Sequence, residues 1–334
     1  MKTLIIAEAG VNHNGDMDIA EELIFKAAEG GADLIKFQSF VAEEMTSKSA
    51  DKAAYQNASS DTGSNQFEML SKLQLTREQH VQLLNKCNKQ GIGFFSSAFD
   101  LDSIEMLENL NFSNIIKVPS GELTNLPYLR KIARTRKQVL LSTGLCTLGD
   151  IESAINILEE AGTSRNKITI LQCTTDYPAA IEDVNLQAML NMKATFGTQI
   201  GYSDHTLGIE VPIAAVALGA TVIEKHFTLD RNLLGPDHKA SLEPDDFTIM
   251  VKAIRNIERA LGDGIKRPSQ SELTNLVAVR KSIVARENIK VGEVFSEKNL
   301  TTKRPGSGIS PMCWEQILGR RAMRDFAKDE MIEI

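Results

Sequence analysis

The chain has 334 residues, which exceeds the ~250 residues of a common barrel domain by enough for one appended module. Hydrophobic residues make up 42% and charged residues 24% of the sequence, which excludes a disordered, collagen-like or disulfide-framework protein. The formal net charge of −7 argues against a nucleic-acid partner, because no basic surplus is left to neutralise phosphates along a duplex.

Short β-rich apolar runs recur along the chain and alternate with amphipathic stretches of helical period. Several of these stretches end in glycine, as at AEELIFKAAEGG, which is typical of a helix C-terminus. The alternation predicts parallel strands joined by right-handed crossovers, and eight such strands fit a (β/α)8 barrel. The predicted strands are Leu4–Ala7, Leu34–Gln38, Gly93–Ser96, Ile115–Val118, Val139–Ser142, Ile168–Gln172, Gln199–Tyr202 and Thr221–Lys225.

Every predicted strand ends in polar residues, which is where a barrel of this kind carries its chemistry. Glu8 follows the first strand, Ser96 and Ser97 end the third, and Glu224 and His226 end the eighth. The structural alternative is a doubly wound sheet, whose phosphate loop would show GxGxxG after the first strand. The segment GVNHNG lacks that spacing, so the barrel is favoured.

Two further regions lie outside the barrel pattern. Residues 42–66 are polar, small and long for a connection between strand and helix, which favours a functional loop or lid. After a predicted barrel domain of residues 1–262, residues 263–276 have the composition of a linker. Residues 277–334 then form a module with short strand-like pieces, and so small a core often rests on a partner surface.

Cysteine usage and the apolar runs indicate the compartment. Cys87, Cys146, Cys173 and Cys313 are widely spaced without a CxxC pair, which favours reduced thiols over a zinc cluster or disulfide scaffold. The apolar run at the N-terminus meets Glu8 too early for a signal peptide. No apolar stretch reaches the ~20 residues of a membrane helix. We therefore expect a cytoplasmic protein without a membrane partner.

Two of the five histidines, His205 and His226, end consecutive predicted strands in the segments YSDH and EKH. A single histidine of this kind is more often a hydrogen-bonded core residue, but two on adjacent strand ends favour a divalent metal site. No third protein ligand is evident. We therefore expect an open site for Mn²⁺ or Mg²⁺ that water and substrate complete. His80 lies in an amphipathic stretch and is interpreted as structural.

Lys36 and Lys117 end the second and fourth predicted strands, flanked by apolar residues in LIKFQ and IIKVPSG. Lysine is seldom buried without a partner, so one interpretation is an ion pair with Glu8 or Glu122 inside the barrel. The interpretation that we favour is a cationic cradle for a small substrate that carries phosphate and carboxylate groups. The hydroxyls that would assist it on the same rim are those of Ser97, Ser120 and Ser203.

The remaining candidates are carboxylates and one arginine. Glu8 and Glu122 are candidate acid or base groups, since carboxylates near lysines and a metal can differ widely in pKa; the alternative role of either is to orient a lysine. Asp237, in GPDHKAS, could bind sugar hydroxyls or cap the next helix. Arg304 lies in the Gly-rich run RPGSGI, for which a surface turn and a functional site both remain open.

Several segments share sequence and order with one known family: IAEAGVNHNG, IKFQSF, FFSSAFD, IKVPSGEL, LSTGL, LQCTTDYP, GYSDHTLGIEVPIAAVALGA, IEKHFTLD, GPDHKASLEP and KRPGSGI. With these motifs the chain resembles the sialic acid synthase family of nonulosonate synthases over nearly its whole length. The resemblance implies a phosphoenolpyruvate-condensing (β/α)8 barrel followed by an antifreeze-like (SAF) domain. It also implies a head-to-tail homodimer in which the small domain covers the partner's active site.

The resemblance also assigns roles to residues of this chain. It implies that the metal ligands are His205 and His226, and that Glu8 is the carboxylate near the reacting carbons. The implied contacts of phosphoenolpyruvate are Lys36, Ser97, Lys117, Ser120 and Ser203. The implied contacts of an N-acyl amino sugar are Gln38, Tyr177 and Asp237, with Glu122 nearby, and Arg304 from the partner's small domain for the N-acyl group.

In the reaction that the resemblance implies, C3 of phosphoenolpyruvate attacks the aldehyde of an open-chain amino sugar, water adds at C2, and phosphate leaves by C–O cleavage. Family members that act on N-acetylmannosamine often carry Asn at the position of Thr175, whereas LQCTTDYP is closer to synthases of legionaminic acid. A shorter, partly apolar Thr suits a deoxygenated sugar, which favours 2,4-diacetamido-2,4,6-trideoxymannose. The alternatives are an N-acetylneuraminate synthase, a metal-dependent aldolase and a non-enzymatic sugar-binding protein.

Overall fold

The computed structural model describes residues 2–52 and 65–334, so part of the predicted loop at 42–66 lies outside the described residues. The chain divides into two compact units, Met1–Gly262 and Asp263–Ile334. In the described ranges, no helix combines the length and the apolar character needed to cross a membrane.

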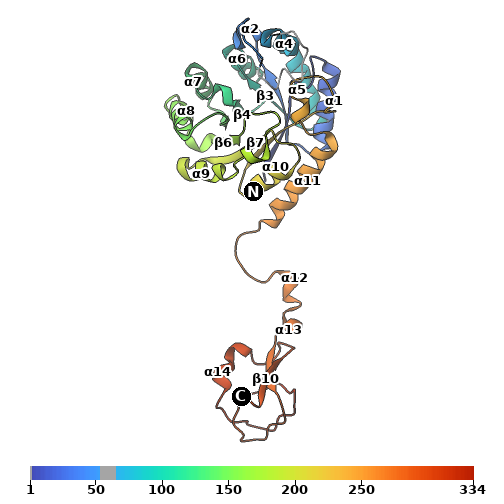
Figure 1. The fold of residues 1–334 in the computed structure, drawn as a ribbon, viewed down its shortest axis with the longest axis vertical. Helices are drawn as coiled ribbons and strands as arrows, with labels where there is room; N and C mark the ends of the chain where they lie inside the picture. Colours follow the sequence, from blue (N-terminus) through green and yellow to red (C-terminus); the bar gives the residue numbers. More distant parts are fainter. Residues whose placement is uncertain (1, 53–64) are drawn as a thin grey trace. The chain divides into compact units, whose positions relative to one another are not determined.

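Within the described residues, eight parallel strands of the first unit form one sheet that curves into a nearly closed barrel, which confirms the predicted architecture (Figure 1). The order β3-β2-β1-β8-β7-β6-β5-β4 means that β1 pairs with β8 and that each other ladder joins strands consecutive in the chain. The strands are β1 (Leu4–Gly10), β2 (Leu34–Ser39), β3 (Gly93–Ala98), β4 (Ile115–Val118), β5 (Gln138–Ser142), β6 (Ile168–Cys173), β7 (Gln199–Asp204) and β8 (Val222–His226).

The strands extend up to three residues beyond their predicted ends. Glu8, Ser97 and His226 therefore lie within β1, β3 and β8, where the sequence placed them at or after the strand ends. Glu8 stands in register with Lys36 on one side and with His226 on the other. Polar side chains at the barrel mouth do not end the ladder, because its hydrogen bonds are made by the backbone.

No ladder joins β3 to β4 in the part of the chain that the structure describes, which leaves a gap in the barrel wall. Tyr128, fully buried on helix α7 (Leu126–Arg134), lies across this gap. Its hydroxyl donates a hydrogen bond to the carbonyl of Ala98 at 2.8 Å and lies 3.3 Å from the carbonyl of Lys117. The phenol thus connects the C-terminal ends of two strands that the backbone leaves unpaired.

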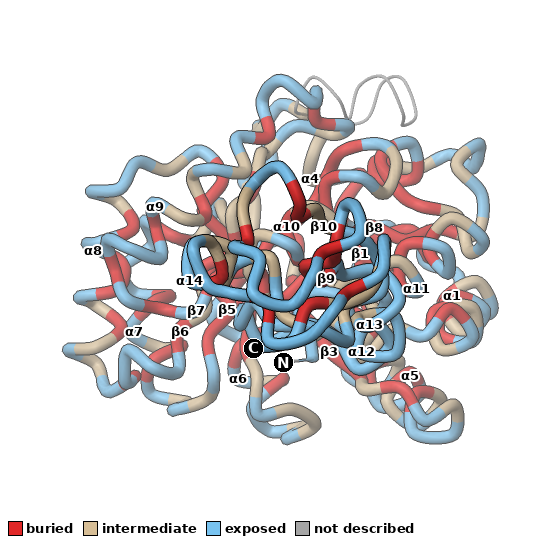
Figure 2. Tube along the Cα trace, turned by 90° about the horizontal axis from the view of Figure 1, so that it is seen from below, coloured by how far each residue is buried: buried red, intermediate tan, exposed pale blue. Residues whose placement is uncertain are grey.

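Helices surround the strands and bury one face each against them, so that buried and exposed residues alternate along their length (Figures 1 and 2). Their ends follow local signals: α5 begins with a capping box between Thr76 and Gln79 and ends at Gly91, whose φ of +69° favours glycine. The helices of this unit are α1 (Met17–Glu29), α2 (Ala42–Met45), α4 (Gln66–Leu73), α5 (Arg77–Gln90), α6 (Leu101–Leu110), α7 (Leu126–Arg134), α8 (Leu148–Glu160), α9 (Gln187–Phe196), α10 (Glu210–Ala217) and α11 (Pro244–Ala260).

The second unit is a small domain with its own core. It contains α12 (Gln270–Leu273) and α13 (Leu276–Val279), the antiparallel pair β9 (Ser282–Ala285) and β10 (Leu300–Lys303), and α14 (Trp314–Ile317). The short helix α12 lies within the stretch predicted as a linker. Ile283, Phe295 and Phe326 are buried in the core of this unit, which shows that it packs around its own apolar residues.

Candidate active site

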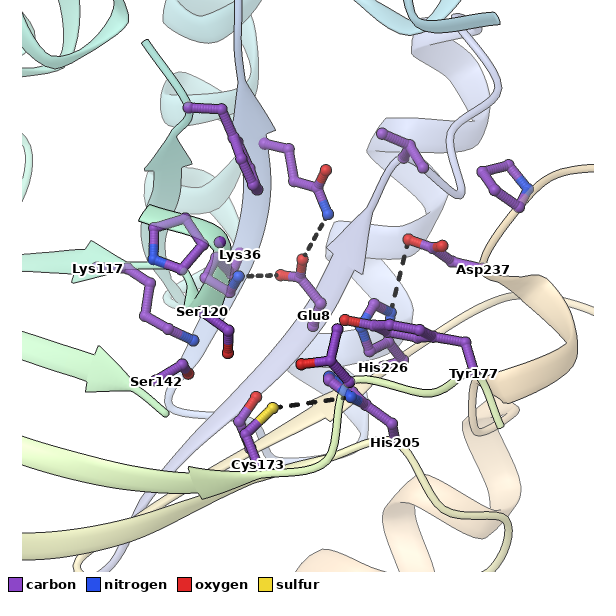
Figure 3. Close-up of a pocket in the computed structure, with 18 of the residues that line it drawn as sticks. Glu8, Lys36, Lys117, Ser120, Ser142, Cys173, Tyr177, His205, His226 and Asp237 are labelled. Atoms are coloured by element: carbon purple, nitrogen blue, oxygen red, sulfur yellow. Dashed lines mark hydrogen bonds and ion pairs between the residues drawn. The ribbon is translucent and has the colours of Figure 1, made fainter. Parts of the chain in front are cut away.

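A cavity of about 260 Å³ opens among the C-terminal ends of the barrel strands (Figure 3). The side chains that meet there come from distant parts of the sequence, as expected for a barrel whose strands all end on one rim. The polar lining includes Glu8, Lys36, Gln38, Lys117, Ser120, Ser142, Cys173, Thr175, Tyr177, Ser203, His205, Glu224, His226 and Asp237.

Two buried lysines and two buried glutamates form an ion-pair network at the base of this site. Lys36 Nζ lies 2.9 Å from Glu8 Oε2 and donates to Ser97 Oγ at 3.0 Å, so the predicted pair with Glu8 is present. Lys117 donates to both carboxylate oxygens of Glu224, at 2.6 and 2.8 Å. Because two positive charges face two negative ones, the network compensates its own charge in the absence of substrate.

Glu122 does not take part in this network, so of the two ion-pair partners that the sequence left open for the lysines, Glu8 is present and Glu122 is not. It lies in a 3₁₀ turn after β4, Ser120–Glu122, where it is half-buried and accepts a hydrogen bond from Asn125 at 2.6 Å. It is absent from the described lining of the cavity. Burial raises the pKa of Glu122, and its carboxylate is engaged by Asn125, the residue that caps the next helix.

The two glutamates of the network differ in their affinity for a proton. Burial raises the pKa of Glu8 to about 7 against the attraction of Lys36, and the nearby charge of Glu224 adds to this rise. Burial also disfavours ionisation of Glu224, but Lys117 and Lys36 outweigh it and hold the pKa of Glu224 well below its usual range. Neighbouring carboxylates with separated pKa values are the arrangement that acid–base chemistry requires.

His205 and His226 face each other at the mouth of the site, with ring centroids 5.2 Å apart. His205 Nδ1 lies 2.6 Å from the carbonyl of Thr174, which can only accept, so Nδ1 carries a proton and Nε2 is the nitrogen that a metal would bind in the neutral ring. The ring of Tyr177 stacks on His205 at 4.1 Å between centroids. Burial and the neighbouring His205 hold the pKa of His226 well below its usual range, which favours the neutral ring.

These imidazoles have the donor chemistry of a divalent metal site. His226 Nδ1 is buried without a hydrogen-bond partner among the described residues and lies 3.9 Å from Asp237 Oδ2 (Figure 3). An orphaned neutral imidazole nitrogen beside a second imidazole fits an ion such as Mn²⁺. The described residues contain no group of three or more His, Cys, Asp and Glu side chains placed to hold a metal, so water or substrate would complete the coordination.

Gly10 allows three polar side chains to converge beside the histidines. Its φ is +52°, and a Cβ there would lie 3.1 Å from Gln38 Nε2, 3.2 Å from Glu8 Oε1 and 3.4 Å from Asp237 Oδ2. Gln38 donates to Glu8 at 3.1 Å. Burial raises the pKa of Asp237 to about 6, so this carboxyl, like Glu8, exchanges its proton near neutral pH.

Gly144 serves the opposite side of the cavity in the same way. A Cβ at this position would lie 2.0 Å from the hydroxyl oxygen of Thr175, so glycine is needed for Thr175 to occupy its place. The Gly144 amide donates to Ser120 Oγ at 3.0 Å. The Thr175 hydroxyl is buried and has no hydrogen-bond partner in the described part of the chain, which leaves it available to a ligand.

The structure brings most of the predicted site residues together, but not all of them. Glu122 and Ser97 lie outside the described cavity lining, although Ser97 accepts a hydrogen bond from Lys36. Arg304 lies in the second unit, where it is exposed and its Nε donates to the carbonyl of Val279 at 3.0 Å. Glu224 was noted at the end of a predicted strand but was not included among the candidate site residues. It precedes His226 by two residues in β8, and this period of two places both side chains on the same face.

Comparison with known proteins identifies relatives across the whole chain. The model of the NeuB family matches residues 23–266, and the model of the SAF domain matches residues 280–333. The chain is 53% identical to N,N'-diacetyllegionaminic acid synthase of Campylobacter jejuni over 99% of both chains. It is 44% identical to the protein of the same name from Legionella pneumophila over 96% of this chain and 90% of that one.

A solved structure has the same fold. The N-acetylneuraminic acid (sialic acid) synthetase of Leptospira borgpetersenii, crystallised in complex with citrate, is 33% identical to this chain and superimposes with a TM-score of 0.73. The match covers 82% of this chain and 90% of that one. The similarity therefore extends from sequence motifs to the arrangement of the barrel.

Proposed function

The chain belongs to the NeuB family, and on this premise we propose that it condenses phosphoenolpyruvate with 2,4-diacetamido-2,4,6-trideoxymannose, giving N,N'-diacetyllegionaminate and phosphate. The observation that carries the proposal is the cavity in which buried lysines adjoin a pair of imidazoles, in a chain 53% identical to a protein named for this product. Lysines suit the anionic substrate, and imidazoles suit a metal that acts on an aldehyde.

Lys36 and Lys117 bind the phosphate and carboxylate groups of phosphoenolpyruvate in this proposal. Their present partners, Glu8 and Glu224, orient them in the absence of the anion, and the hydroxyls that assist are those of Ser97, Ser120 and Ser203. Fixing the enol face opposite the aldehyde turns a bimolecular encounter into a positioned reaction. The new bond joins C3 of phosphoenolpyruvate to the aldehyde carbon, water adds at C2, and phosphate leaves with its bridging oxygen by C–O cleavage.

Glu8 handles the proton of the attacking water. Its pKa of about 7 allows it to accept and release a proton at neutral pH, whereas Glu224 stays ionised and keeps Lys117 in place. This assigns to Glu8 the acid–base role that the sequence left open between Glu8 and Glu122. Gln38, hydrogen-bonded to Glu8, holds that carboxylate toward the reacting carbons.

His205 and His226 hold a divalent ion, Mn²⁺ or Mg²⁺, which when bound supplies Lewis-acid polarisation of the sugar aldehyde. The hydrogen bond from His205 Nδ1 to the Thr174 carbonyl fixes the ring orientation that this requires. Removal of one imidazole leaves too few protein donors, so His226→Ala should abolish Mn²⁺ binding, measured by isothermal titration calorimetry. Near-normal Mn²⁺ binding, or near-normal turnover under chelator, would refute the metal assignment.

The sugar contacts and the assembly complete the proposal. Gln38, Thr175, Tyr177 and Asp237 bind the sugar from the barrel side of the site. Arg304 reaches the N-acyl group from the small domain of a second copy, in a homodimer whose small domain covers the partner's active site. The free state of all four cysteines supports a cytoplasmic location.

The decisive experiment gives the purified protein phosphoenolpyruvate together with each candidate sugar and measures phosphate release. We expect phosphate and an equimolar nonulosonate with the diacetamido sugar, and less with N-acetylmannosamine. An N-acetylneuraminate synthase, favoured as the second candidate by the relative from Leptospira borgpetersenii, would give the reverse order. A metal aldolase or a sugar-binding protein would release no phosphate with either sugar, and that result would exclude the proposed reaction.

A further inference from the structure

One side of the active-site cavity is apolar, although the strand ends around it are polar. The side chains on this side come from the loop after β1, from α2, from α4 and from the residue after β3. They form one surface, here called the apolar wall: Val11, Met45, Met69, Leu70, Leu73 and Phe99. Figure 1 shows α2 and α4 together at the end of the barrel that lies opposite the N-terminus.

The apolar wall is the inner surface of a packed cluster. All six residues belong to one hydrophobic cluster that also contains Phe40, Ala42 and Phe67, which do not line the cavity. Met69, Leu70 and Leu73 are each 6% exposed, so the parts of these side chains that do not face the cavity pack against other apolar side chains. These six side chains offer a firm apolar surface without hydrogen-bonding groups. Gln66 of α4 also lines the cavity, and its Oε1 already accepts a hydrogen bond from the Thr46 hydroxyl at 3.0 Å.

The position of the wall relative to the polar groups indicates which part of the proposed sugar would lie against it. Val11 directly follows Gly10, where the polar groups of Glu8, Gln38 and Asp237 converge. The lysines and the imidazoles line the polar side of the cavity, where the proposed function puts phosphoenolpyruvate and the reacting aldehyde. With the aldehyde there, the non-reacting end of the sugar would extend past Gln38 toward the apolar wall.

We infer that the apolar wall selects the 6-deoxy end of the sugar, an inference that rests on the proposed function. The methyl group at C6 buries apolar surface against Met69 and its neighbours, whereas a C6 hydroxyl would lose its water there without a new partner. Discrimination by an apolar pocket against one added hydroxyl is on the order of 10²-fold at most. The wall thus sets a preference among related amino sugars and leaves the chemistry to the polar side.

The test compares 2,4-diacetamido-2,4,6-trideoxymannose with its 6-hydroxy counterpart, 2,4-diacetamido-2,4-dideoxymannose, by phosphate release with phosphoenolpyruvate. The measured quantity is the ratio of kcat/KM for the two sugars in one preparation, which loss of folded protein does not alter. We expect a ratio of at least about 10 in favour of the 6-deoxy sugar. Failure of both sugars would refute the proposed function, whereas equal turnover of both would overturn only the role of the wall.

Substitutions in the apolar wall test whether its side chains cause the preference for the 6-deoxy sugar. Met69→Gln keeps the length of the side chain and adds hydrogen-bonding groups, so the ratio should fall at least about 5-fold, whereas Met69→Leu should retain it. Met45→Gln, at a partly exposed position, provides the same comparison if Met69→Gln does not fold. Phe67→Leu, in the same cluster but away from the cavity, is the matched control and should leave the ratio unchanged. An unchanged ratio in the folded Gln variants overturns the inference.

Discussion

Ion pairs with carboxylates explain how two lysines can be buried at the proposed substrate site. Lys117 is 2% exposed and Lys36 is 4% exposed, and each is stabilised by a carboxylate within 3 Å. In the proposed reaction, the phosphate would replace part of this carboxylate contact, so each lysine would stay paired with an anion. The residues proposed to bind phosphoenolpyruvate are thus also residues whose ion pairs join strands at the barrel mouth.

Replacement of Lys117 tests this function directly. Lys117→Gln removes one charge-assisted contact to phosphoenolpyruvate, worth about 1.5–3 kcal/mol, so kcat/KM for phosphoenolpyruvate should fall by roughly 10- to 100-fold. Steady-state kinetics with each substrate varied in turn provide the measurement. The KM for the sugar, which lies on the other side of the cavity, is the internal control. An equal rise of both KM values would indicate general damage and contradict the assignment.

Glu8 should leave a pH signature in the stability of the metal-free protein. Its pKa rises from 4.5 to about 7 on folding, so the folded state binds the proton more tightly. The stabilisation from protonation is complete below pH 4.5 and is lost as the pH rises through about 7. The variant Glu8→Gln lacks this titrating carboxyl. Its free energy of unfolding should therefore decrease less than that of the wild-type protein across this pH window, with a difference of at most about 3 kcal/mol.

Urea unfolding of the wild-type protein and Glu8→Gln at a series of pH values measures this difference in slope. Asp237, whose pKa is also raised by burial, is present in both proteins and therefore cancels. If the plots of unfolding free energy against pH were parallel for the two proteins, Glu8 would not change its proton affinity on folding.

The sequence predicted most single site residues because each lies at the end of a recognisable strand. Glu8, Lys36, His205 and His226 were found in this way and line one cavity. Glu122 also follows a strand, but proximity to a strand end does not fix the direction of a side chain: the chain turns at Ser120–Glu122, and the carboxylate accepts a hydrogen bond from Asn125 outside the described cavity lining. The partner of Lys117 comes from β8, more than one hundred residues away, and no local pattern encodes that pairing.

At the level of elements, strands β7 and β8 show how the two imidazoles are kept in place. Because side chains alternate along a strand, Asp204 and Lys225 point to the opposite face from their histidine neighbours. Both are fully buried, and Lys225 Nζ donates to Asp204 at 2.6 Å and to the carbonyl of Thr206 at 2.5 Å. This pair joins the two strands directly behind the proposed metal ligands.

Breaking the pair should destabilise the barrel strongly. Lys225→Met leaves Asp204 as an uncompensated buried charge, which costs about 3–5 kcal/mol of unfolding free energy. The double variant Asp204→Leu/Lys225→Met should recover much of this loss, because neither charge is then buried alone. Denaturant unfolding measures both, with Lys131→Met, which breaks an exposed pair with Glu105, as the matched control. A double variant no more stable than Lys225→Met would contradict this account.

The periodicity of apolar residues explains why the strands could be predicted from the sequence and why the apolar wall could not. Buried parallel strands are continuous apolar runs between amphipathic helices, and this pattern gave all eight strands of the described barrel. The apolar wall was missed because α2 and α4 lie in and beside a segment, 42–66, whose composition is polar and lacks such a period. Met45 and Met69 acquire their role only through packing against Val11 and Phe99, which are distant in the sequence.

For the whole molecule, the division into a barrel unit and a small unit gives the proposed assembly a specific test. If each active site combines a barrel with the Arg304 of a second copy, two defective subunits can complement each other. Mixed Arg304→Ala and His226→Ala subunits should recover up to roughly a quarter of wild-type activity, because half of the dimers are mixed and each has one intact site.

The complementation assay uses refolded or coexpressed mixtures, with each variant alone as the control for residual activity. Arg304 is exposed in its own unit, so its replacement should leave the stability of the subunit almost unchanged. Absence of any recovered activity in verified heterodimers would show that the sites are not shared.

The gap between β3 and β4 gives the barrel a built-in seam. Ser97 lies on the β3 side and Lys117 on the β4 side, and in the described structure Tyr128 bridges the two edges near the site. In the proposed reaction, the phosphate of phosphoenolpyruvate would contact residues of both edges and so would link two strands that no backbone ladder joins among the described residues. Substrate binding would then stabilise the barrel specifically along the β3–β4 edge.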